Sequence, residues 1–352
     1  MAKKVLIVDD SALVRKQLIE MIETLDFEID TAKNGQEAVD KATRMQYDVI
    51  TMDINMPVMD GIEAVKQIME AKPTAILMIS SLTTEDATIT MDALDLGAVD
   101  YIAKPGTMNV GKRENREDIL SKVKSLSRIP TRRLKRRASK PPVRERRRTE
   151  SIASASTLTS LDITKVVVIG SSTGGPGLIE QICASIPINY KYPICIVQHM
   201  PAQFTAAFAE RLNRASAVRV HESAQNMELL PGNIYVARGG VHMNFTKKVS
   251  GKVVIREDKE KGENFFQPSV NDMMKSAVSH FGAENLIGVI LTGIGDDGAD
   301  AMVEIKKGHG YTLGESEESA TVYGMPKEAY DRGGVMEQLD FMQILKKIAT
   351  LK

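Results

Sequence analysis

The sequence of 352 residues contains no tryptophan and only two cysteines, Cys183 and Cys195. Both cysteines lie in apolar surroundings, so we expect reduced core residues and no disulfide framework. No apolar run reaches the roughly 18 residues that a membrane span needs, and the N-terminus passes directly into a predicted strand. These absences argue against a disulfide-rich secreted protein and against a membrane-inserted one, and they predict a cytoplasmic location.

A net charge of either sign is also missing, because 46 lysines and arginines balance 46 aspartates and glutamates. The chain as a whole therefore has no electrostatic drive toward nucleic acid or membrane, and no nucleic acid partner is expected. Positive charge is instead concentrated in residues 122–148, and a Ser/Thr-rich stretch follows to Ser160. This composition predicts a solvated linker at 124–160 between domains at 1–123 and 161–352. A contact of the basic segment with nucleic acid or an anionic membrane is an alternative, but its arginines have no interleaved aromatic residues.

Short apolar strands alternate with amphipathic helices through about the first 124 residues. The expected strands are Val5–Val8, Glu28–Ala32, Val49–Met52, Ala75–Ile79 and Tyr101–Ala103. Such alternation predicts an α/β fold with a doubly wound parallel sheet, in which ligands gather at the carboxyl ends of the strands. Strand and helix patterns resume at Lys165, with strands expected at Val166–Ile169, Ile194–Val197, Asn233–Ala237, Val253–Arg256 and Leu286–Leu291.

Polar residues follow four of the strands expected in the first domain. Asp9 and Asp10 end the first strand, Asp53 the third, Ser80 the fourth and Lys104 the fifth. In a parallel sheet these ends converge on one edge, where three carboxylates would need a hard cation such as Mg²⁺. One carboxylate could then act as a nucleophile toward a phosphoryl group. Each residue alone has a simpler explanation, because Asp-Asp after a strand is commonly a helix cap and Lys-Pro is commonly a turn.

Together these residues closely resemble the receiver domain of bacterial response regulators over about the first 120 residues. The matching segments are Val8-Asp9-Asp10-Ser11, Asp53-Ile54-Asn55-Met56-Pro57-Val58-Met59-Asp60-Gly61, Ser80-Ser81 and Lys104-Pro105. The resemblance implies that Asp53 is phosphorylated and that Asp9, Asp10 and Asp53 hold Mg²⁺. It further implies that Ser80 is the hydroxyl that moves on phosphorylation, Tyr101 the coupled aromatic residue and Lys104 the phosphate partner.

A glycine-rich turn, Gly170–Gly175, directly follows the expected strand Val166–Ile169 and fits the G-x-S-x-G nucleophile elbow. A serine such as Ser172 needs a base, and the base needs a third group to orient it. His199 and Asp297 each follow another expected strand, so the three side chains can meet if those strands are neighbours. Backbone N–H groups of the Gly293–Gly298 loop, or of the turn after Ser172, could supply an oxyanion hole.

Other interpretations of the second site stay open on residue pattern alone. The turn could bind a phosphate or a dinucleotide, although no Gly-Lys-Ser/Thr follows it and the G-x-G-x-x-G spacing is absent. Spacing does not separate Asp296 from Asp297. A triad of Ser172, Asp297 and His309 would follow the chain order of α/β-hydrolases, but those enzymes need several strands before the elbow.

The second domain resembles the catalytic domain of the CheB family of chemotaxis methylesterases from about Asp162 to the C-terminus. The matching segments are Ile169-Gly170-Ser171-Ser172-Thr173-Gly174-Gly175-Pro176, Gln198-His199-Met200-Pro201 and Leu291-Thr292-Gly293-Ile294-Gly295-Asp296-Asp297-Gly298-Ala299. The resemblance implies Ser172 as nucleophile, His199 as general base and Asp297 as orienting carboxylate, with no cofactor for the ester chemistry. Ile294 departs from the methionine that is common in the family at this position.

The two resemblances together imply an α/β protein of two doubly wound parallel-sheet domains, a CheY-like receiver followed by a methylesterase domain. The implied reaction is hydrolysis of glutamate methyl esters on methyl-accepting chemotaxis receptors, with deamidation of receptor glutamines by the same chemistry. A chemotaxis histidine kinase would be the phosphodonor for Asp53. The alternative is a phosphorylation-controlled protein that binds receptors without turning them over.

Overall fold

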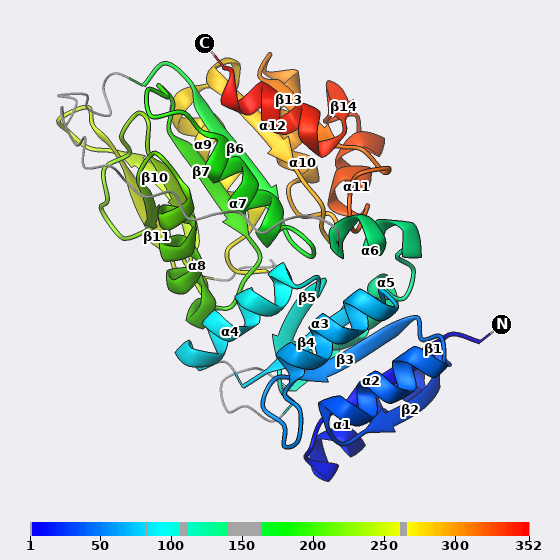
Figure 1. Cartoon of the computed structure of the whole chain (residues 1–352). Coiled ribbons are helices and arrows are strands. Elements are labelled where there is room, and N and C mark those ends of the chain that lie inside the picture. Colours follow the sequence, from blue (N-terminus) through cyan, green and yellow to red (C-terminus); the bar gives the residue numbers. More distant parts are fainter. Residues whose placement is uncertain (1, 82, 106–111, 139–162, 261–265, 352) are drawn as a thin grey trace. The chain divides into compact units, whose positions relative to one another are not determined.

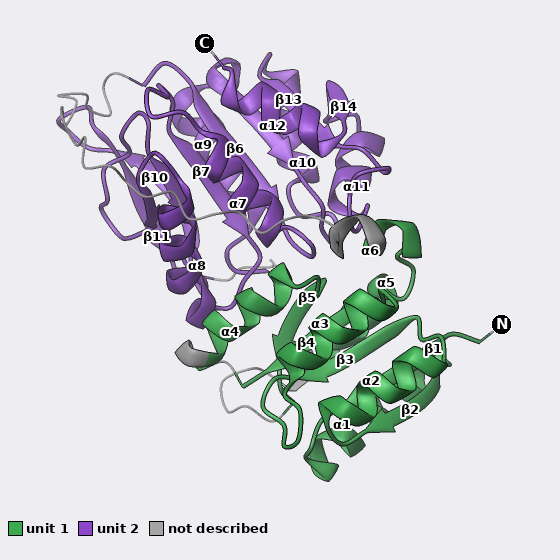
Figure 2. Cartoon of the chain, in the orientation of Figure 1, with its two compact units in different colours: residues 1–142 green, residues 143–352 purple. Residues whose placement is uncertain are grey.

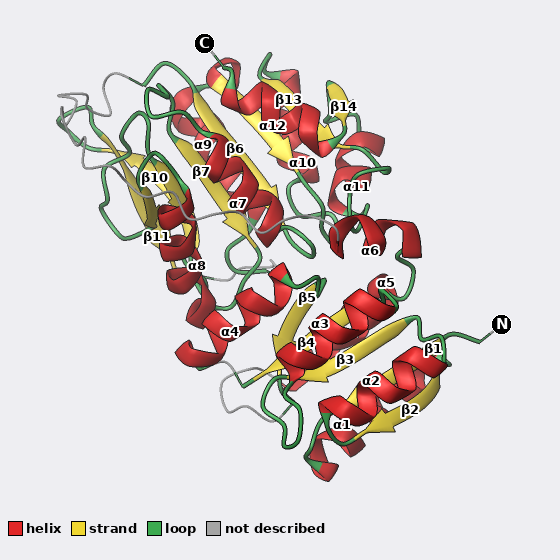
Figure 3. Cartoon of the chain, viewed as in Figure 1, coloured by secondary structure: helices red, strands yellow, loops and turns green. Residues whose placement is uncertain are grey.

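The computed structural model describes residues 2–81, 83–105, 112–138, 163–260 and 266–351. The chain divides into two compact units, Met1–Pro142 and Val143–Lys352 (Figure 2). In each unit helices lie against the strands of a sheet (Figure 3). The described part of the chain contains no helix with both the length and the apolar character that a bilayer span requires.

The first unit is built on a five-stranded parallel sheet in the order β2-β1-β3-β4-β5 (Figure 1). Its strands are β1 (Lys4–Val8), β2 (Glu28–Ala32), β3 (Val49–Asp53), β4 (Ile76–Ser80) and β5 (Asp100–Ala103). Its helices include α1 (Ala12–Ile22), α2 (Gly35–Arg44), α3 (Gly61–Ala71), α4 (Thr84–Asp95), α5 (Lys112–Leu126) and α6 (Thr131–Ala138). The predicted doubly wound parallel sheet is therefore confirmed, with β1 and β3 adjacent at its centre.

Helix structure in the first unit continues past the predicted boundary at residue 123. That boundary falls inside α5, and α6 lies within the segment that we expected to be a linker. The reason is that apolar residues of this segment pack on the core of the unit: Leu126 and Leu134 belong to that core, and Ile129 packs against it. The rest of the predicted linker, from residue 139 to 160, lies outside the described residues.

The second unit contains a seven-stranded sheet in the order β14-β13-β12-β6-β7-β9-β8, and neighbouring strands all pair in parallel. Its strands are β6 (Val166–Ser171), β7 (Ile194–Gln198), β8 (Val220–Glu222), β9 (Ile234–Val236), β12 (Leu286–Ile290), β13 (Tyr311–Glu315) and β14 (Glu337–Leu339). A separate antiparallel hairpin is formed by β10 (His242–Lys247) and β11 (Val253–Asp258). The flanking α-helices are α7 (Pro176–Ser185), α8 (Ala202–Ala215), α9 (Val270–Phe281), α10 (Ala299–Lys307), α11 (Met325–Asp331) and α12 (Phe341–Ala349).

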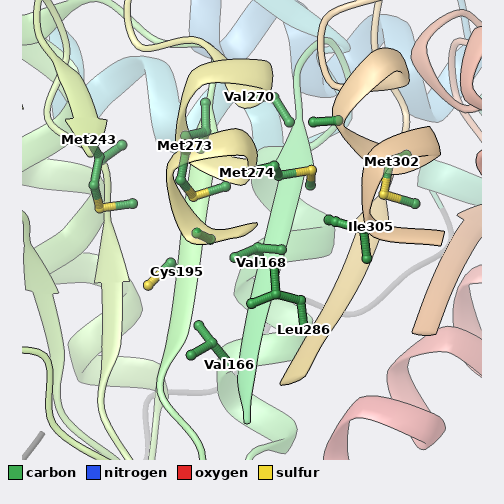
Figure 4. Close-up of a cluster of buried hydrophobic side chains, with 14 of the residues drawn as sticks. Val166, Val168, Cys195, Met243, Val270, Met273, Met274, Leu286, Met302 and Ile305 are labelled. Atoms are coloured by element: carbon green, nitrogen blue, oxygen red, sulfur yellow. The ribbon is translucent and has the colours of Figure 1, made fainter. Parts of the chain in front are cut away.

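A large apolar core in the second unit fixes two of these helices, α9 and α10, near the central strands. Figure 4 shows Met273 and Met274 of α9 beside Val168 of β6, with Met302 of α10 nearby. Cys195 of β7 is buried in the same cluster as a free thiol, and Cys183 is likewise buried and free. Burying an aliphatic or methionine side chain contributes about 1.5–3 kcal/mol, so this core holds the N-terminus of α9 firmly beside β6.

Candidate functional sites

Ser172, His199 and Asp297 follow three strands that are direct neighbours in the second unit. Ser172 follows the central strand β6, His199 follows β7 on one side, and Asp297 lies in the loop that follows β12 on the other. Strand pairing continues to the ends of β6 and β7, and the His199 N–H donates to the Ser171 carbonyl oxygen at 3.0 Å. The carboxyl ends of parallel strands form the edge at which ligands bind, so all three side chains lie at that edge.

His199 and Asp297 form the central contact of this site. His199 Nε2 lies 2.8 Å from Asp297 Oδ2, which also accepts the Val270 N–H at 2.7 Å. The other carboxylate oxygen, Oδ1, accepts the Ser269 hydroxyl and the Asn271 N–H, each at 2.9 Å. Both carboxylate oxygens are thus occupied, and the carboxylate has a fixed orientation toward the imidazole.

The environment of Asp297 favours its ionised form. Burial alone would raise the pKa of this carboxyl, but the hydrogen bonds from His199, Asn271 and Val270 lower it below its ordinary value. The last two donors belong to the first turn of α9, where unpaired N–H groups and the helix dipole stabilise an anion. Asp297 is therefore an anion suited to orient a histidine and to stabilise its protonated form.

The second nitrogen of His199 is available for proton transfer. Within the described residues, His199 Nδ1 is buried and has no hydrogen-bond partner. Because Nε2 is bound to Asp297, Nδ1 is the nitrogen that can take a proton from a nucleophile. Ser172, which directly follows β6, is 5% exposed.

The backbone around Ser172 is tied to both neighbouring strand ends. The Ser172 N–H donates to the Thr292 carbonyl oxygen at 3.0 Å. The side-chain amide of Gln198 donates through Nε2 to the carbonyl oxygens of Ser172 at 2.9 Å and of His199 at 3.2 Å. Gly174 has a φ of 80°, the left-handed conformation in which glycine avoids the cost of a Cβ, and this allows the sharp turn between β6 and α7. The predicted strand–turn–helix elbow is therefore present.

Several residues of the site were not identified from the sequence. Phe266 stacks on the His199 ring with centroids 3.9 Å apart and planes at 15°. Gln198, Ser269 and Asn271 bind the serine turn or Asp297 as described above. A usable signal existed for Ser269, because Ser269-Val270-Asn271-Asp272 has the spacing of a helix-capping box, and Ser269 does cap α9. Nothing in the sequence indicates the Phe266 stack.

The structure distinguishes the alternatives that spacing left open. Asp296 is 61% exposed and binds Arg332 at 2.5 Å, whereas Asp297 binds His199. His309 is exposed in the turn between α10 and β13, and its place in the site is taken by His199. The geometry therefore favours Asp297 over Asp296 and His199 over His309.

A close contact between Gly293 and Ser172 gives a testable prediction. A Cβ at Gly293 would lie 2.9 Å from the Ser172 Cβ and 2.2 Å from the Met325 sulfur. We expect Gly293→Ala to displace the serine turn, to lower the free energy of unfolding by about 1–3 kcal/mol and to lower kcat by about 100-fold. Gly177→Ala is the matched control, because a Cβ there meets nothing within 4 Å. Urea unfolding and ester hydrolysis measured on both variants test this, and a Gly293→Ala variant as active as Gly177→Ala would contradict it.

The carboxylates expected at the edge of the first sheet do lie together. Ligand oxygens of Asp9, Asp10 and Asp53 are all within 4.8 Å of one another, with Asp9 and Asp53 buried and Asp10 exposed. Lys104 reaches the same cluster, 2.8 Å from Asp53 Oδ2 and 3.4 Å from Asp9 Oδ2. One ammonium group cannot balance three carboxylates, so the donor set and its charge fit a hard divalent cation.

Electrostatics in this cluster disfavour the ionised form of Asp53. Burial, followed by the charge of Asp9, raises the pKa of Asp53 from 3.8 to about 6, although Lys104 acts in the opposite direction. Burial also raises the pKa of Asp9. The carboxylates of this cluster therefore repel one another, and a bound divalent cation would relieve that repulsion.

This repulsion predicts that Asp53→Asn stabilises the first unit in metal-free buffer. A folded-state pKa above the unfolded value means that the folded chain binds more protons between about pH 4 and pH 6. Stability therefore falls as the pH rises through that window. At about pH 7.5 the neutral variant should be more stable by about 1–3 kcal/mol. Urea-dependent hydrogen exchange of peptides from β1 to β5 measures this, with Asp10→Asn as the exposed control; a destabilised Asp53→Asn variant would contradict the expectation.

Ser80 and Tyr101, the other expected members of this site, are both buried. Ser80 ends β4 and is 1% exposed, while Tyr101 of β5 is 3% exposed. Burial raises the pKa of the Tyr101 hydroxyl well above its ordinary value, so this group stays protonated. Asn55, two residues after Asp53, donates to Asp86 of α4 at 3.1 Å. The loop after Asp53 is thereby connected to α4, a contact that the sequence did not indicate.

Comparison with known proteins gives matches over both units. Residues 167–348 match the family model for the CheB methylesterase, and residues 5–113 match that for the response regulator receiver domain. The protein-glutamate methylesterase/protein-glutamine glutaminase 2 of Carboxydothermus hydrogenoformans is 46% identical over 354 residues, covering 99% of this chain and 98% of that protein. The protein-glutamate methylesterase/protein-glutamine glutaminase of Caldanaerobacter subterraneus subsp. tengcongensis is 42% identical, covering 94% of this chain and 91% of that protein. The crystal structure of the Thermotoga maritima CheB methylesterase catalytic domain is 36% identical, with a TM-score of 0.51 over 53% of this chain and 98% of that structure.

Proposed function

Because the chain belongs to the CheB methylesterase family and carries a response regulator receiver domain, we propose that it hydrolyses glutamate methyl esters in proteins and deamidates glutamines. Both reactions are acyl transfers to water, with methanol or ammonia as the leaving group, so one nucleophile and one base serve both. The substrates are methyl-accepting chemotaxis receptors, and a chemotaxis histidine kinase supplies the phosphoryl group to the receiver. The protein acts in the cytoplasm, where the receptor domains that carry the methyl esters are accessible.

Ser172 is the nucleophile of the esterase site in this proposal. Its Oγ attacks the acyl carbon while His199 Nδ1 takes the hydroxyl proton; the imidazolium then gives this proton to the leaving group, which departs as methanol or ammonia. Asp297 holds the ring through Nε2 and stabilises the imidazolium. Water then attacks the acyl-enzyme with His199 again as the base, which releases a glutamate carboxylate.

Backbone N–H groups of the loop after β12 are proposed to bind the oxyanion. The N–H groups of Ser172 and Gly293 already donate to carbonyl oxygens. Ile294 and Gly295 follow Gly293, at which an added Cβ would lie 2.9 Å from the Ser172 Cβ, so their N–H groups are the donors that we assign. A backbone donor is indifferent to the side chain, which explains why isoleucine is acceptable at position 294.

Asp53 is the phosphorylated residue of the receiver in this proposal. Asp9, Asp10 and Asp53 would hold Mg²⁺, which neutralises the incoming phosphoryl oxygens when it is bound. Lys104 stabilises the added negative charge, Ser80 donates its hydroxyl to the phosphoryl group, and Tyr101 responds to that movement. Phosphorylation adds about 1.5–2 negative charges at neutral pH, enough to shift a two-state surface.

The observation that carries the esterase assignment is the His199–Asp297 pair beside Ser172, with His199 Nδ1 buried and without a partner. Methanol release from methyl-labelled receptor membranes tests the function, using the full chain with Mg²⁺ and a small-molecule phosphodonor. We expect release by the wild type, stimulation by the phosphodonor, and loss of the stimulation alone in Asp53→Ala. Receptor binding without methanol release would instead support the alternative of binding without turnover, which the relatives, named for hydrolytic activities, do not favour.

A further inference from the structure

The aromatic ring of Phe266 covers one face of the imidazole that we assign as the general base. The two rings are nearly parallel, with planes at 15° and centroids 3.9 Å apart. The side chain of His199 is only 5% exposed, so the stack lies in a largely desolvated place. Phe266 is thus a direct neighbour of the base, although it offers no hydrogen-bonding or titratable group.

The position of Phe266 is fixed by the same segment that binds Asp297. The next residue, Gln267, accepts the Gly240 N–H through its carbonyl oxygen at 3.0 Å. Two residues further along the chain, Ser269 donates its hydroxyl to Asp297 Oδ1 and caps α9. The wall against the imidazole and the binding site of its carboxylate are therefore built by one short stretch of backbone.

Proton transfer changes the charge of the group that Phe266 covers. When His199 Nδ1 takes the hydroxyl proton of Ser172, the imidazole becomes a cation between the Asp297 carboxylate and the Phe266 ring. The face of an aromatic ring carries partial negative charge and attracts cations, more strongly where water is excluded. The contact is therefore stronger in the transition state than in the resting enzyme, which is the condition for raising kcat rather than lowering KM.

We propose that Phe266 is a positioning residue of the esterase reaction, whose π face stabilises the protonated form of His199 and keeps its ring aligned with Ser172 and Asp297. This inference rests on the proposed role of His199 and adds a residue to it. The aromatic face, and not only the apolar bulk, is the required property. Replacing the ring by an aliphatic group of similar size should lower kcat without affecting the binding of substrate.

The test removes or weakens the negative charge on the ring faces at position 266 while keeping an apolar side chain of similar size. The full chain is prepared with Phe266→Leu, which removes the π face, and with 3,4,5-trifluorophenylalanine at position 266, which keeps the ring but withdraws charge from its faces. We expect kcat for methanol release to fall by about 3- to 30-fold in both variants, with KM within about twofold of the wild type. Urea unfolding of each variant verifies that it is folded. A trifluorophenylalanine variant with the wild-type kcat, or a change confined to KM, would overturn the proposal.

A second readout separates failure of this inference from failure of the proposed receptor reaction. The acylation burst with p-nitrophenyl acetate reports proton transfer from Ser172 to His199 without any receptor, and Ser172→Ala gives its background. We expect the burst rate of both ring variants to fall by the same factor as kcat. If the wild type gives a burst but releases no methanol from receptors, the substrate assignment fails, and the burst rates alone decide the role of Phe266. Equal burst rates in the wild type and in both ring variants would disprove it.

Discussion

Methanol release is expected to fall by about 10⁴- to 10⁶-fold in Ser172→Ala, the range seen when the nucleophile of a serine hydrolase is removed. The substitution removes only the hydroxyl oxygen of a serine that follows β6, the strand next to β7, which His199 follows. The turn should persist, because it is held by the Ser172 N–H, which donates to the Thr292 carbonyl oxygen, and by the side-chain amide of Gln198, which donates to the Ser172 carbonyl oxygen. Radiolabelled methanol measured against a buffer blank, together with circular dichroism of the variant, gives the result.

Ser171→Ala is the matched control for this prediction. Ser171 is the preceding residue and is fully buried, and its hydroxyl donates a long hydrogen bond of 3.4 Å to the Thr292 carbonyl oxygen. Its loss should cost about 1 kcal/mol of stability and leave kcat within a few-fold of the wild type. If Ser172→Ala kept more than about one hundredth of the wild-type rate, or if Ser171→Ala were the inactive variant, the nucleophile assignment would be wrong.

Asp297→Asn should lower kcat by about 10⁴-fold, the size of effect found when the orienting carboxylate of a triad becomes an amide. Each oxygen of Asp297 accepts two hydrogen bonds. Oδ2 accepts from His199 and the Val270 N–H, and Oδ1 accepts from the Ser269 hydroxyl and the Asn271 N–H. An asparagine must place its NH₂ group against donors on one side. At the Oδ1 position the NH₂ group faces the Asn271 N–H. At the Oδ2 position it faces the Val270 N–H and forces His199 to accept at Nε2 and to carry its proton on Nδ1. The second state removes the base, because Nδ1 can no longer take the proton of Ser172.

The neighbouring carboxylate provides the control for this second prediction. Asp296→Asn removes an exposed charge that binds Arg332, and we expect kcat within about threefold of the wild type. Asp297→Asn also weakens the N-terminus of α9, so its free energy of unfolding should fall by about 1–3 kcal/mol while the chain stays folded. Urea unfolding and kcat are measured on both variants. An inactive Asp296→Asn with an active Asp297→Asn would exchange the roles of the two residues.

The parallel sheets were predictable from the sequence because their central strands are continuous β-branched and aliphatic runs. Val166–Ile169 and Val49–Met52 are examples, and both lie in observed strands. The short edge strands β8 and β14, with three residues each, were missed because so few residues carry no periodicity. α6 was missed because its composition is dominated by arginines, and only the packing of Leu134 distinguishes it from a solvated charge run.

The site was predictable to the extent that strand ends locate it. Ser172, His199 and Asp297 each follow a recognisable strand, and parallel pairing brings such ends together. The sequence does not show which way each side chain of the site points. Asp296 and Asp297 are adjacent in the chain, and only the fold points one toward Arg332 and the other toward His199. The stack of Phe266 on His199 joins residues far apart in the sequence, so no local pattern predicts it.

The carboxylate of Asp297 binds both His199 and the N-terminus of α9, and this links the loss of activity on denaturation to the unfolding of that helix. Asp297 accepts the N–H groups of the first two residues of α9, and this helix is anchored in the core around β6 by Val270, Met273 and Met274 (Figure 4). Heat or denaturant that lifts α9 from the sheet therefore also releases the carboxylate that orients the imidazole. Inactivation and undocking of this helix should occur in one step. With Ser172 as the proposed nucleophile, we expect a nascent or half-denatured chain to carry no activated serine, so that hydrolysis is confined to molecules that have finished folding.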